Sequence, residues 1–379
     1  MKRIIFQLFF MVVLAFGGRI AFAQDPQLVA KDPQGHGLLC KAGTKRVLIV
    51  AGTPEQMGGA HGRLLSDLVP QVMPRTMALV GAGLAVQKGE WFYDCIDEIY
   101  RHASPHTPER FIRECRAMAI GAGITERDAF CGNFFPELFH CSGVAVRNTA
   151  SADGRVVHAR VLDYMRDINL QRYTVLQVFI PEGGIPWMSV GYAGFLGTVT
   201  AMNAHGLAIG EMGGHGEKVW DGMPMTFLMR EIAERAETVD QALEIMRKNP
   251  RTCEYYYVIS DAKRNMVGVC ATPKKVDVLV PGQQNPLLPA IPADTVLISA
   301  GNRAKTLSER IQSNFGKITP ERMIEIIKRP VSMQSNLHNA IFVPETLDMW
   351  FADAGKKRLR AMSRTRRSTF APCLTIMRK

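Results

Sequence analysis

Cys141 is the residue of this 379-residue chain whose position suggests the most specific chemistry. It lies far from both ends, where a segment that predicts helix and loop meets one that predicts a strand. Cleavage of the bond between His140 and Cys141 would give this residue a free α-amine beside its own thiol. Such an amine has a pKa of roughly 7.7–8.0, which suits a general base near neutral pH. One residue would then supply both nucleophile and base; the alternative is an ordinary buried or disulfide-bonded cysteine.

The pattern of expected elements changes at this junction. Before it, residues 24–44 are polar, with Pro and Gly, and predict a loosely ordered start, followed by a strand and several helices. After it, short apolar runs separated by turn residues predict strands, interrupted by a pair of helices over 224–248. This order predicts two sheets covered by helices, an α+β layered fold. Further expected elements include a strand over 45–52, helices over 90–102 and 108–121, and hairpins over 142–164, 255–272 and 337–354.

Residues 1–23 predict an export signal that is removed. Lys2 and Arg3 precede a short apolar run, and Ala-Phe-Ala precedes Gln24, which is the pattern of a signal peptide and its cleavage site. The alternative is an uncleaved membrane anchor, although the apolar run is short for a span. We therefore expect an exported protein, located in the periplasm or outside the cell.

The formal net charge of +11 is concentrated at the two ends of the chain. Residues 356–379 hold nine Lys or Arg and no Asp or Glu, and the predicted signal holds three more basic residues, so the body between them is nearly neutral. The basic tail is either a disordered, solvated end or a contact for an anionic surface. Aromatic residues do not alternate with the basic ones, so we expect no nucleic-acid partner.

The cysteines and histidines show no metal-binding spacing. The sequence contains neither a Cys-x-x-Cys pair nor a His-Glu-x-x-His motif, so we expect no metal and no other cofactor. An exported protein can oxidise its thiols, and one disulfide could form within the group Cys40, Cys95, Cys115 and Cys131. A catalytic thiol at Cys141 must stay outside such a disulfide.

Several segments, in matching order, resemble the acyl-coenzyme A:6-aminopenicillanic acid acyltransferase family of self-cleaving N-terminal-nucleophile hydrolases. The resemblance extends from about residue 46 to residue 355. It implies a four-layer αββα sandwich, cleavage before Cys141 into a two-fragment heterodimer, and activity on an amide, thioester or related acyl bond of a small molecule. Residues 24–140 would be the pro-segment or small subunit, and 141–355 the catalytic segment. The matching segments are 52–62, 114–133, 141–142, 153–164, 202–211 and 260–272.

The resemblance also implies roles for polar residues after the cysteine. Arg160 and Asp163 match an Arg-x-x-Asp pair beside the nucleophile, where a carboxylate holds a terminal ammonium and an arginine favours the thiolate. Asn203 and Asn302 are the candidates for the oxyanion hole, Asn302 through its side chain and Asn203 by placing the backbone. The alternatives are a surface ion pair and two turn residues.

The remaining implied site residues and the departures from the family lie at four positions. Ser308 and Arg310 either line the acyl or carboxylate pocket or are a helix cap and a solvated arginine. Family members commonly have Gly before the cysteine, which relieves crowding at the cleavage site, but this chain has His140. The later family motif usually reads Asn-His, but here Arg303 follows the asparagine.

Three functions from different classes remain open at this point. The first, which we expect, is an exported, self-processed cysteine amidase or acyltransferase; a water acceptor gives hydrolysis and an amine acceptor gives transfer. The second is an unprocessed envelope protein that only binds acyl or peptide ligands. The third is a papain-like protease with His61 or His205 as its base, although neither histidine has papain-like surroundings.

Overall fold

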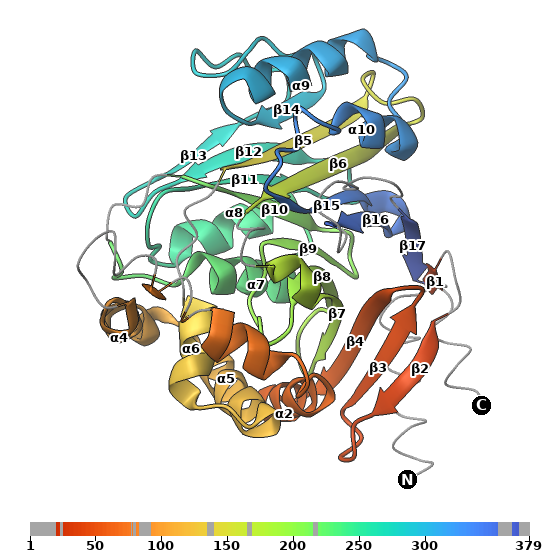
Figure 1. Ribbon diagram of the computed structural model, residues 1–379. Coiled ribbons are helices and arrows are strands. Elements are labelled where there is room, and N and C mark those ends of the chain that lie inside the picture. Colours follow the sequence, from red (N-terminus) through yellow and green to blue (C-terminus); the bar gives the residue numbers. More distant parts are fainter. Residues whose placement is uncertain are drawn as a thin grey trace.

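The computed structural model describes residues 20–22, 26–76, 78, 81–82, 92–134, 140–164, 169–214, 219–354 and 366–370. Two large sheets face each other, and helices cover the outer side of each (Figure 1). This four-layer α+β arrangement confirms the predicted αββα fold. Within the described part of the chain, no helix is long and apolar enough to cross a membrane.

The seven-stranded sheet has the order β1-β17-β16-β15-β6-β5-β14. Its strands are β1 (Ile20–Phe22), β5 (His140–Asn148), β6 (Gly154–Asp163), β14 (Thr295–Ile298), β15 (Asn336–Val343), β16 (Asp348–Asp353) and β17 (Arg366–Phe370). The outer side of this sheet is covered by α9 (Gly301–Ser313) and α10 (Pro320–Ile326).

The ten-stranded sheet has the order β13-β12-β11-β10-β9-β8-β7-β4-β3-β2. Its strands are β2 (Gln27–Lys31), β3 (Gly37–Ala42), β4 (Lys45–Gly52), β7 (Thr174–Pro181), β8 (Trp187–Tyr192), β9 (Thr200–Asn203), β10 (Ala208–Gly213), β11 (Tyr255–Ser260), β12 (Met266–Ala271) and β13 (Val276–Leu279). The helices on its outer side are α2 (Pro54–Leu64), α4 (Phe92–Ala103), α5 (Glu109–Ala122), α6 (Glu126–Phe134), α7 (Met225–Arg235) and α8 (Val239–Lys248).

The segment before Cys141 is built into this ten-stranded sheet. Strand β4 pairs in parallel with β7, from Arg46 opposite Val175 to Gly52 opposite Pro181, and β3 and β2 continue the sheet beyond β4. The prediction of a loosely ordered start over residues 24–44 is therefore wrong for β2 and β3. Leu39 of β3 is buried and pairs with β4, so apolar burial and strand pairing order this polar segment.

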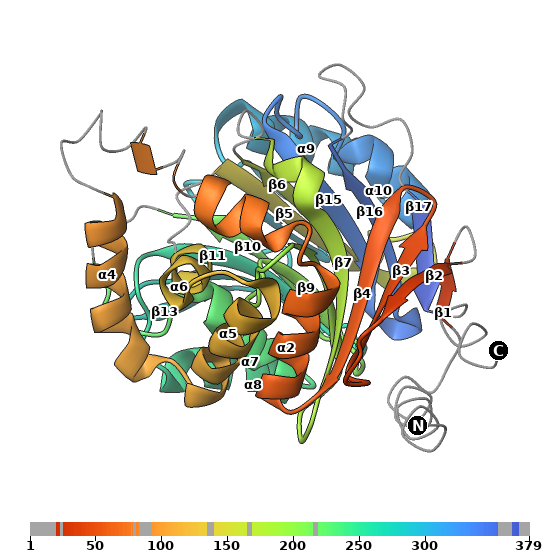
Figure 2. The same ribbon diagram turned by 60° about the horizontal axis from the view of Figure 1, so that its bottom comes forward.

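Helix α2 begins with a capping box and packs closely on α5 (Figure 2). The Thr53 hydroxyl accepts from the Gln56 amide at 3.3 Å, and the Gln56 side chain accepts from the Thr53 amide at 2.9 Å, which satisfies two backbone donors at the helix start. A Cβ on Gly58 would lie 2.2 Å from the Glu114 carbonyl oxygen of α5. Glycine at this position therefore lets the two helices approach each other.

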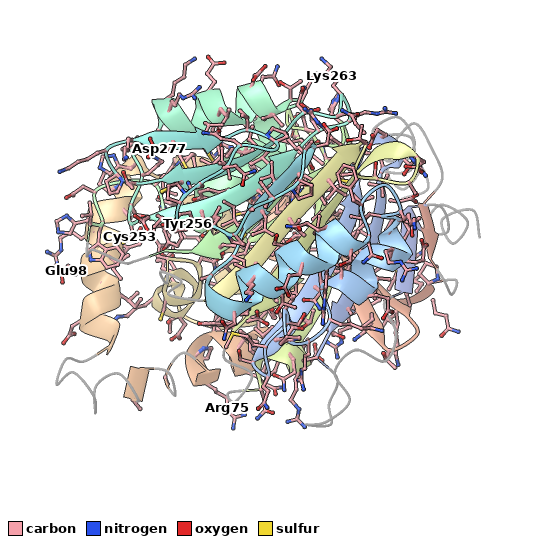
Figure 3. The ribbon with its side chains drawn as sticks, turned by 90° about the horizontal axis from the view of Figure 1, so that it is seen from above. Arg75, Glu98, Cys253, Tyr256, Lys263 and Asp277 are labelled. Carbon is pink, nitrogen blue, oxygen red and sulfur yellow. The ribbon has the colours of Figure 1, made fainter. Side chains whose placement is uncertain are left out.

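The predicted hairpin over 142–164 is confirmed by β5 and β6, whose register places Cys141 opposite Leu162. Side chains alternate along β5, because successive residues of a strand point to opposite faces. Cys141 and Ala145 belong to the core between the sheets, and Val144 belongs to the core under α9 and α10. Exposed charged side chains lie around the rim of the molecule; Figure 3 labels Lys263 as one of them.

Two short strands fall in the segments that the sequence predicts as an export signal and a basic tail. Strand β1 pairs antiparallel with β17, with Ile20 opposite Phe370 and Phe22 opposite Ser368. Most of residues 1–23 and 356–379 lie outside the described residues. The signal and the disordered tail therefore stay predictions.

Candidate functional site around Cys141

Cys141 is the second residue of β5, and its side chain faces the other sheet. Residues 135–139, which precede β5, lie outside the described residues. Cys141 is only 6% exposed and belongs to the same apolar cluster as Met212 and Tyr255. A Cβ on Gly143, on the same face of β5, would lie 2.8 Å from the Met212 sulfur. Glycine at this position therefore lets the opposite sheet pack closely beside the thiol.

Arg160 of β6 forms a fully buried ion pair with Glu211 of β10. The Arg160 Nη2 atom lies 3.2 Å from Glu211 Oε2, and neither side chain is exposed. The same guanidinium donates to the backbone carbonyls of Val161 at 2.7 Å and Val199 at 3.4 Å. This pair connects the two sheets, since β6 and β10 belong to different sheets. Both charges also act on the pKa of the Cys141 thiol.

Glu211 is a residue of the site that the sequence analysis missed. It lies in the run Ala-Ile-Gly-Glu-Met-Gly, where it is a lone carboxylate in an otherwise apolar strand. A charge at such a position is costly to bury without a partner, and that was the available signal. A Cβ on its neighbour Gly210 would lie 2.6 Å from Arg160 Cγ, so glycine there leaves room for the arginine.

Asp163, the last residue of β6, is held from three sides. Its Oδ1 atom accepts from the Met333 amide at 2.9 Å and from the Asn336 side chain at 3.1 Å. Its Oδ2 atom forms an ion pair with Arg303. Asp163 lies opposite His140 in the strand register, so this carboxylate is placed beside the bond that the sequence predicts to be cut.

Arg303 is the second residue that the sequence analysis did not assign to the site. Besides Asp163, it donates from Nη2 to the Ser142 hydroxyl at 2.9 Å and from Nε to the Val331 carbonyl at 2.8 Å. Strand β14 pairs with β5, and the Ser142 and Ser299 hydroxyls are 2.7 Å apart. This pairing brings the start of α9 close to the start of β5. The two segments are far apart in the sequence, so no local pattern predicts this contact.

In the intact chain the thiol is a weak acid. Burial raises the pKa of Cys141 to about 11, Arg160 lowers it, and Glu211 and Asp163 raise it. The backbone of Asp163 also hydrogen-bonds toward the thiol, which favours the thiolate. Burial likewise raises the pKa of Asp163, against the opposing effect of Arg303. Reaction at neutral pH therefore needs a base close to Cys141.

Asn203 lies at the end of β9, and its side chain is engaged with the backbone. Its Nδ2 atom donates to the carbonyls of Ala233 and Ala236 at 3.0 and 2.7 Å, and its Oδ1 atom accepts from the amides of His205 and Leu207 at 3.1 and 3.0 Å. The side chain thus fixes the turn between β9 and β10 to the end of α7. A role in placing the backbone fits this geometry.

The three predicted site residues of α9 are not equivalent in position. Asn302 is exposed in the first turn, directly before Arg303. Ser308 is buried and donates to the Ala290 carbonyl at 2.5 Å. Arg310 donates to the carbonyls of Ile326 and Lys328, both at 2.7 Å, and so satisfies the end of α10. Ser308 and Arg310 thus contact outer loops and helices rather than the charge pairs beside Cys141.

The two histidines of the papain-like alternative have other partners. His61 is fully buried, and its Nε2 atom accepts from the Gly194 amide at 2.9 Å. His205 is half exposed, and its Nε2 atom lies 3.8 Å from Glu237. The structure thus shows no thiol–imidazole pair between either histidine and Cys141 among the described contacts.

Cys40, Cys115 and Cys131 form no disulfide with one another among the described residues. The side chain of Cys95, the fourth cysteine of the predicted group, lies outside the described residues. Cys253 donates to the Val219 carbonyl at 3.7 Å, near the start of β11 (Figure 3). Within the described part of the chain, no group of three or more His, Cys, Asp or Glu is arranged to hold a metal ion.

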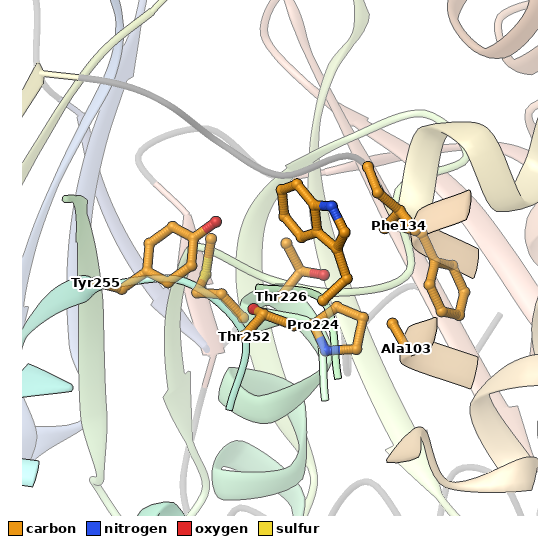
Figure 4. A pocket seen from close by; sticks show the side chains of 9 residues that line it. Ala103, Phe134, Pro224, Thr226, Thr252 and Tyr255 are labelled. Atoms are coloured by element: carbon orange, nitrogen blue, oxygen red, sulfur yellow. The ribbon is translucent and has the colours of Figure 1, made fainter. Parts of the chain in front are cut away.

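A pocket lies between the segment before Cys141 and the segment after it (Figure 4). Phe134, the last residue of α6 and the last described residue before β5, forms part of its wall. The pocket is mainly apolar, and Phe134, Met225 and Tyr255 share the core cluster of Cys141. The residues that line it are Ile99, Ala103, Phe134, Trp220, Pro224, Met225, Thr226, Thr252 and Tyr255.

The model of the acyl-coenzyme A:6-aminopenicillanic acid acyl-transferase family matches residues 150–341, just over half of the chain. This chain belongs to that family, whose members are N-terminal-nucleophile hydrolases acting on amide bonds. The matched range contains Arg160, Asp163, Glu211 and Arg303 and begins after Cys141. The assignment of Cys141 as the nucleophile therefore stays a prediction from the sequence.

Curated relatives match over parts of their length. Protein dcd1B of Dictyostelium discoideum is 24% identical over 366 residues, which cover 85% of this chain and 71% of that protein. Protein dcd1A of the same organism is 28% identical over 274 residues, covering 61% of this chain and 60% of that protein. The N-acylethanolamine-hydrolyzing acid amidase of Rattus norvegicus is 22% identical over 223 residues, 54% of each chain. This chain thus spans 54–71% of these relatives.

Two solved structures show weaker similarity. The N-acylethanolamine-hydrolyzing acid amidase ortholog of Caenorhabditis elegans has a TM-score of 0.46 at 16% identity, covering 54% of this chain and 93% of that chain. The penicillin V acylase of Agrobacterium tumefaciens has a TM-score of 0.39 at 12% identity, covering 56% of this chain and 83% of that chain. The four-layer arrangement is defined by the two sheets and the helices of this chain itself.

Proposed function

We propose that this protein is an exported cysteine amidase that cuts its own chain before Cys141 and then uses Cys141 as its N-terminal nucleophile. The observation that carries this proposal is the placement of one thiol beside two charge pairs, Arg160 with Glu211 and Asp163 with Arg303. Membership of a family that acts on amide bonds supports the same chemistry.

The first step is self-cleavage. The thiol of Cys141 attacks the carbonyl carbon of His140, the acyl group moves from nitrogen to sulfur, and the thiol proton goes to the nitrogen. Water then hydrolyses the thioester, which leaves a carboxylate on His140 and a free amine and thiol on Cys141. The N-terminal fragment stays bound, because β4 remains paired with β7 across the two fragments.

The second step is turnover of an acyl amide. The freed amine accepts the thiol proton, the thiolate attacks the acyl carbonyl, and the proton then passes to the leaving amine. Water hydrolyses the resulting thioester and regenerates the thiol. Arg160 favours the thiolate electrostatically, and Asp163 is placed to hold the ammonium form of the amine.

The tetrahedral oxyanion needs a hydrogen-bond donor. Because both Nδ2 protons of Asn203 are directed at backbone carbonyls, we propose Asn302 as the side-chain donor and Asn203 as the residue that holds the turn. A well-placed amide donor contributes about 2.7–4 kcal/mol to transition-state stabilisation. Asn302 lies beside Arg303 at the start of α9, close in sequence to the Asp163 contact.

The proposed substrate is a small molecule with an apolar acyl group. The apolar side chains of Phe134, Met225 and Tyr255, which share the core cluster of Cys141, support an apolar acyl group. We propose hydrolysis rather than transfer, since an exported enzyme meets little acyl-coenzyme A and abundant water. Export itself rests on the signal pattern of residues 1–23.

A panel of acyl amides tests this function. Purified wild type and Cys141→Ala are incubated with amides whose acyl chains differ in length and polarity, and amine release is measured. We expect wild type to release amine, fastest from apolar acyl groups, and Cys141→Ala to release none. A fully cut wild type that hydrolyses no member of the panel, or equal turnover by Cys141→Ala, would contradict the proposal.

A further inference from the structure

We infer that Arg303 is a positioning residue: it shares the carboxylate of Asp163 with the freed α-amine of Cys141 and so keeps that amine able to accept a proton near neutral pH. This inference rests on the proposed function. It assigns a role to a position where the sequence departs from the Asn-His motif of the family it resembles.

Arg303 contacts both strands at the predicted cleavage point. Its Nη2 atom forms an ion pair with Asp163 at the end of β6 and donates to the Ser142 hydroxyl at the start of β5 at 2.9 Å. The Nε atom is anchored on the Val331 carbonyl at 2.8 Å. The Asp163 side chain is fully buried and that of Arg303 is 14% exposed, so solvent screens this ion pair little. The residues it touches are the neighbour of the nucleophile and the residue opposite His140.

Charge balance explains why this contact matters after cleavage. A buried carboxylate with no other cation would hold the new ammonium strongly and raise the pKa of the amine. The amine would then stay protonated at neutral pH and could not take the thiol proton. Arg303 supplies a permanent positive charge to Asp163, because a guanidinium does not lose its proton in proteins. The amine therefore shares the carboxylate and remains a base.

Other charged or titratable groups lie near Cys141, and the test requires that their contacts do not change. Arg160 on β6 is paired with Glu211 on β10. His338 on β15 hydrogen-bonds to Tyr192 and Thr200 at 3.0 and 2.9 Å, and burial, reinforced by Arg160, lowers its pKa well below the usual value. None of these groups contacts Arg303 in the described hydrogen bonds and ion pairs. A change at Arg303 thus leaves their contacts in place.

The test compares the pH dependence of kcat/KM in wild type, Arg303→Met, Arg303→Lys and Lys305→Met. Lys305 is an exposed cation on the same helix and serves as the matched control. Removing the positive charge beside Asp163 is expected to move the acid limb of Arg303→Met to higher pH by about one unit or more. The acid limb should move to higher pH whether the proton resides on the amine or on the Asp163 carboxylate, because the two groups are coupled and titrate as a pair. Arg303→Lys should shift less, and Lys305→Met should match wild type.

Measuring the intact mass distinguishes failure of the proposed function from failure of the inference about Arg303. If wild type is uncut or inactive, the proposed function fails. If wild type is cut and active and the Arg303→Met profile coincides with that of wild type, the inference fails while the proposed function stands. If Arg303→Met stays uncut, Arg303→Lys decides by the same comparison: a shift toward higher pH supports the inference, and a coincident profile overturns it.

Discussion

Two buried arginines of this protein each lie close to a buried cysteine, yet their surroundings differ. Arg160 acts on Cys141 at the start of a strand, and Arg230 acts on Cys115 within α5. Burial raises the pKa of both thiols, and the nearby arginine lowers each of them. If the proposed function holds, the comparison teaches that a buried arginine beside a thiol is not sufficient for a reactive site. A bond before the cysteine that can be cut would then be the second requirement.

The Arg230 cluster connects the two halves of the chain. Arg230 of α7 lies 2.6 Å from Glu114 of α5 and 2.8 Å from Glu234 of its own helix. Its guanidinium also lies over the rings of Phe111 and Phe179, at 4.7 and 4.9 Å from their centroids. Since Glu114 precedes Cys141 and Arg230 follows it, this cluster would hold the two fragments together after cleavage.

The largest expected contrast between the two regions is in turnover. Cys141→Ala should stay a single chain and lose activity by about 10⁴-fold or more, as expected when a nucleophile is removed. Cys115→Ala should be cut and active, because its thiol is packed inside α5. Fragment masses and amine release measure both. A cut and active Cys141→Ala would break the distinction between the two cysteines.

The second contrast is in stability. Arg230→Met leaves Glu114 buried without its ion-pair partner and Glu234 with Arg110 as its remaining cation. It should lower the free energy of unfolding by about 3–5 kcal/mol. Urea unfolding on the Cys141→Ala background measures this loss without interference from chain cleavage. Arg235→Met, an exposed arginine on the same helix, is the control and should change stability by less than about 1 kcal/mol. Equal losses in both variants would show that the cluster does not hold α5 to α7.

The third prediction concerns the acidity of the nucleophile. Glu211 raises the pKa of the Cys141 thiol, so Glu211→Gln should lower that pKa, by about one unit. The rate of Cys141 alkylation by iodoacetamide as a function of pH reports the change. Glu234→Gln removes a carboxylate of the Arg230 cluster and should leave the Cys141 profile unchanged. An unshifted alkylation profile in Glu211→Gln would contradict the claim that Glu211 raises the pKa of the Cys141 thiol.

The fourth prediction is a pH dependence of stability that both regions share. Burial lowers the pKa of His61, near Arg230, to about 3, and that of His338, near Arg160, well below its usual value. Each histidine stays neutral in the folded protein but takes up a proton on unfolding below about pH 6.5. Its contribution to stability is therefore present above that pH and is lost as the pH falls toward the folded pKa.

Replacement by glutamine isolates this effect. On the Cys141→Ala background, the stability advantage of His61 over His61→Gln should fall by about 1.4 kcal/mol per pH unit between pH 6 and 4. The same slope is expected for His338→Gln. Urea unfolding at several pH values provides the measurement. A constant difference across this range would mean that the histidine is already charged in the folded protein.

Much of the fold was predictable because it depends on local patterns. The switch from helices to alternating strands at Cys141, and the hairpin formed by β5 and β6, follow from the periodicity of the apolar residues. The ordering of residues 27–42 was not predictable in this way. These residues gain order from pairing with β4, which in turn pairs with β7 far along the chain.

The site also has residues that the sequence predicts and residues that only distant contacts bring to it. The resemblance named Arg160 and Asp163, and the structure brings both to Cys141. Glu211 and Arg303 reach the site through contact between the sheets and through pairing of β14 with β5, which no short motif records. Asn203 matched the motif, but its side chain is used by the turn that the same motif forms.

N-terminal sequencing of the purified, active wild-type protein tests the account most directly. We predict two fragments, of which the larger begins at Cys141 and reads Cys-Ser-Gly-Val. An active protein in which Cys141 remains internal to an uncut chain would contradict the claim that this residue is both nucleophile and base.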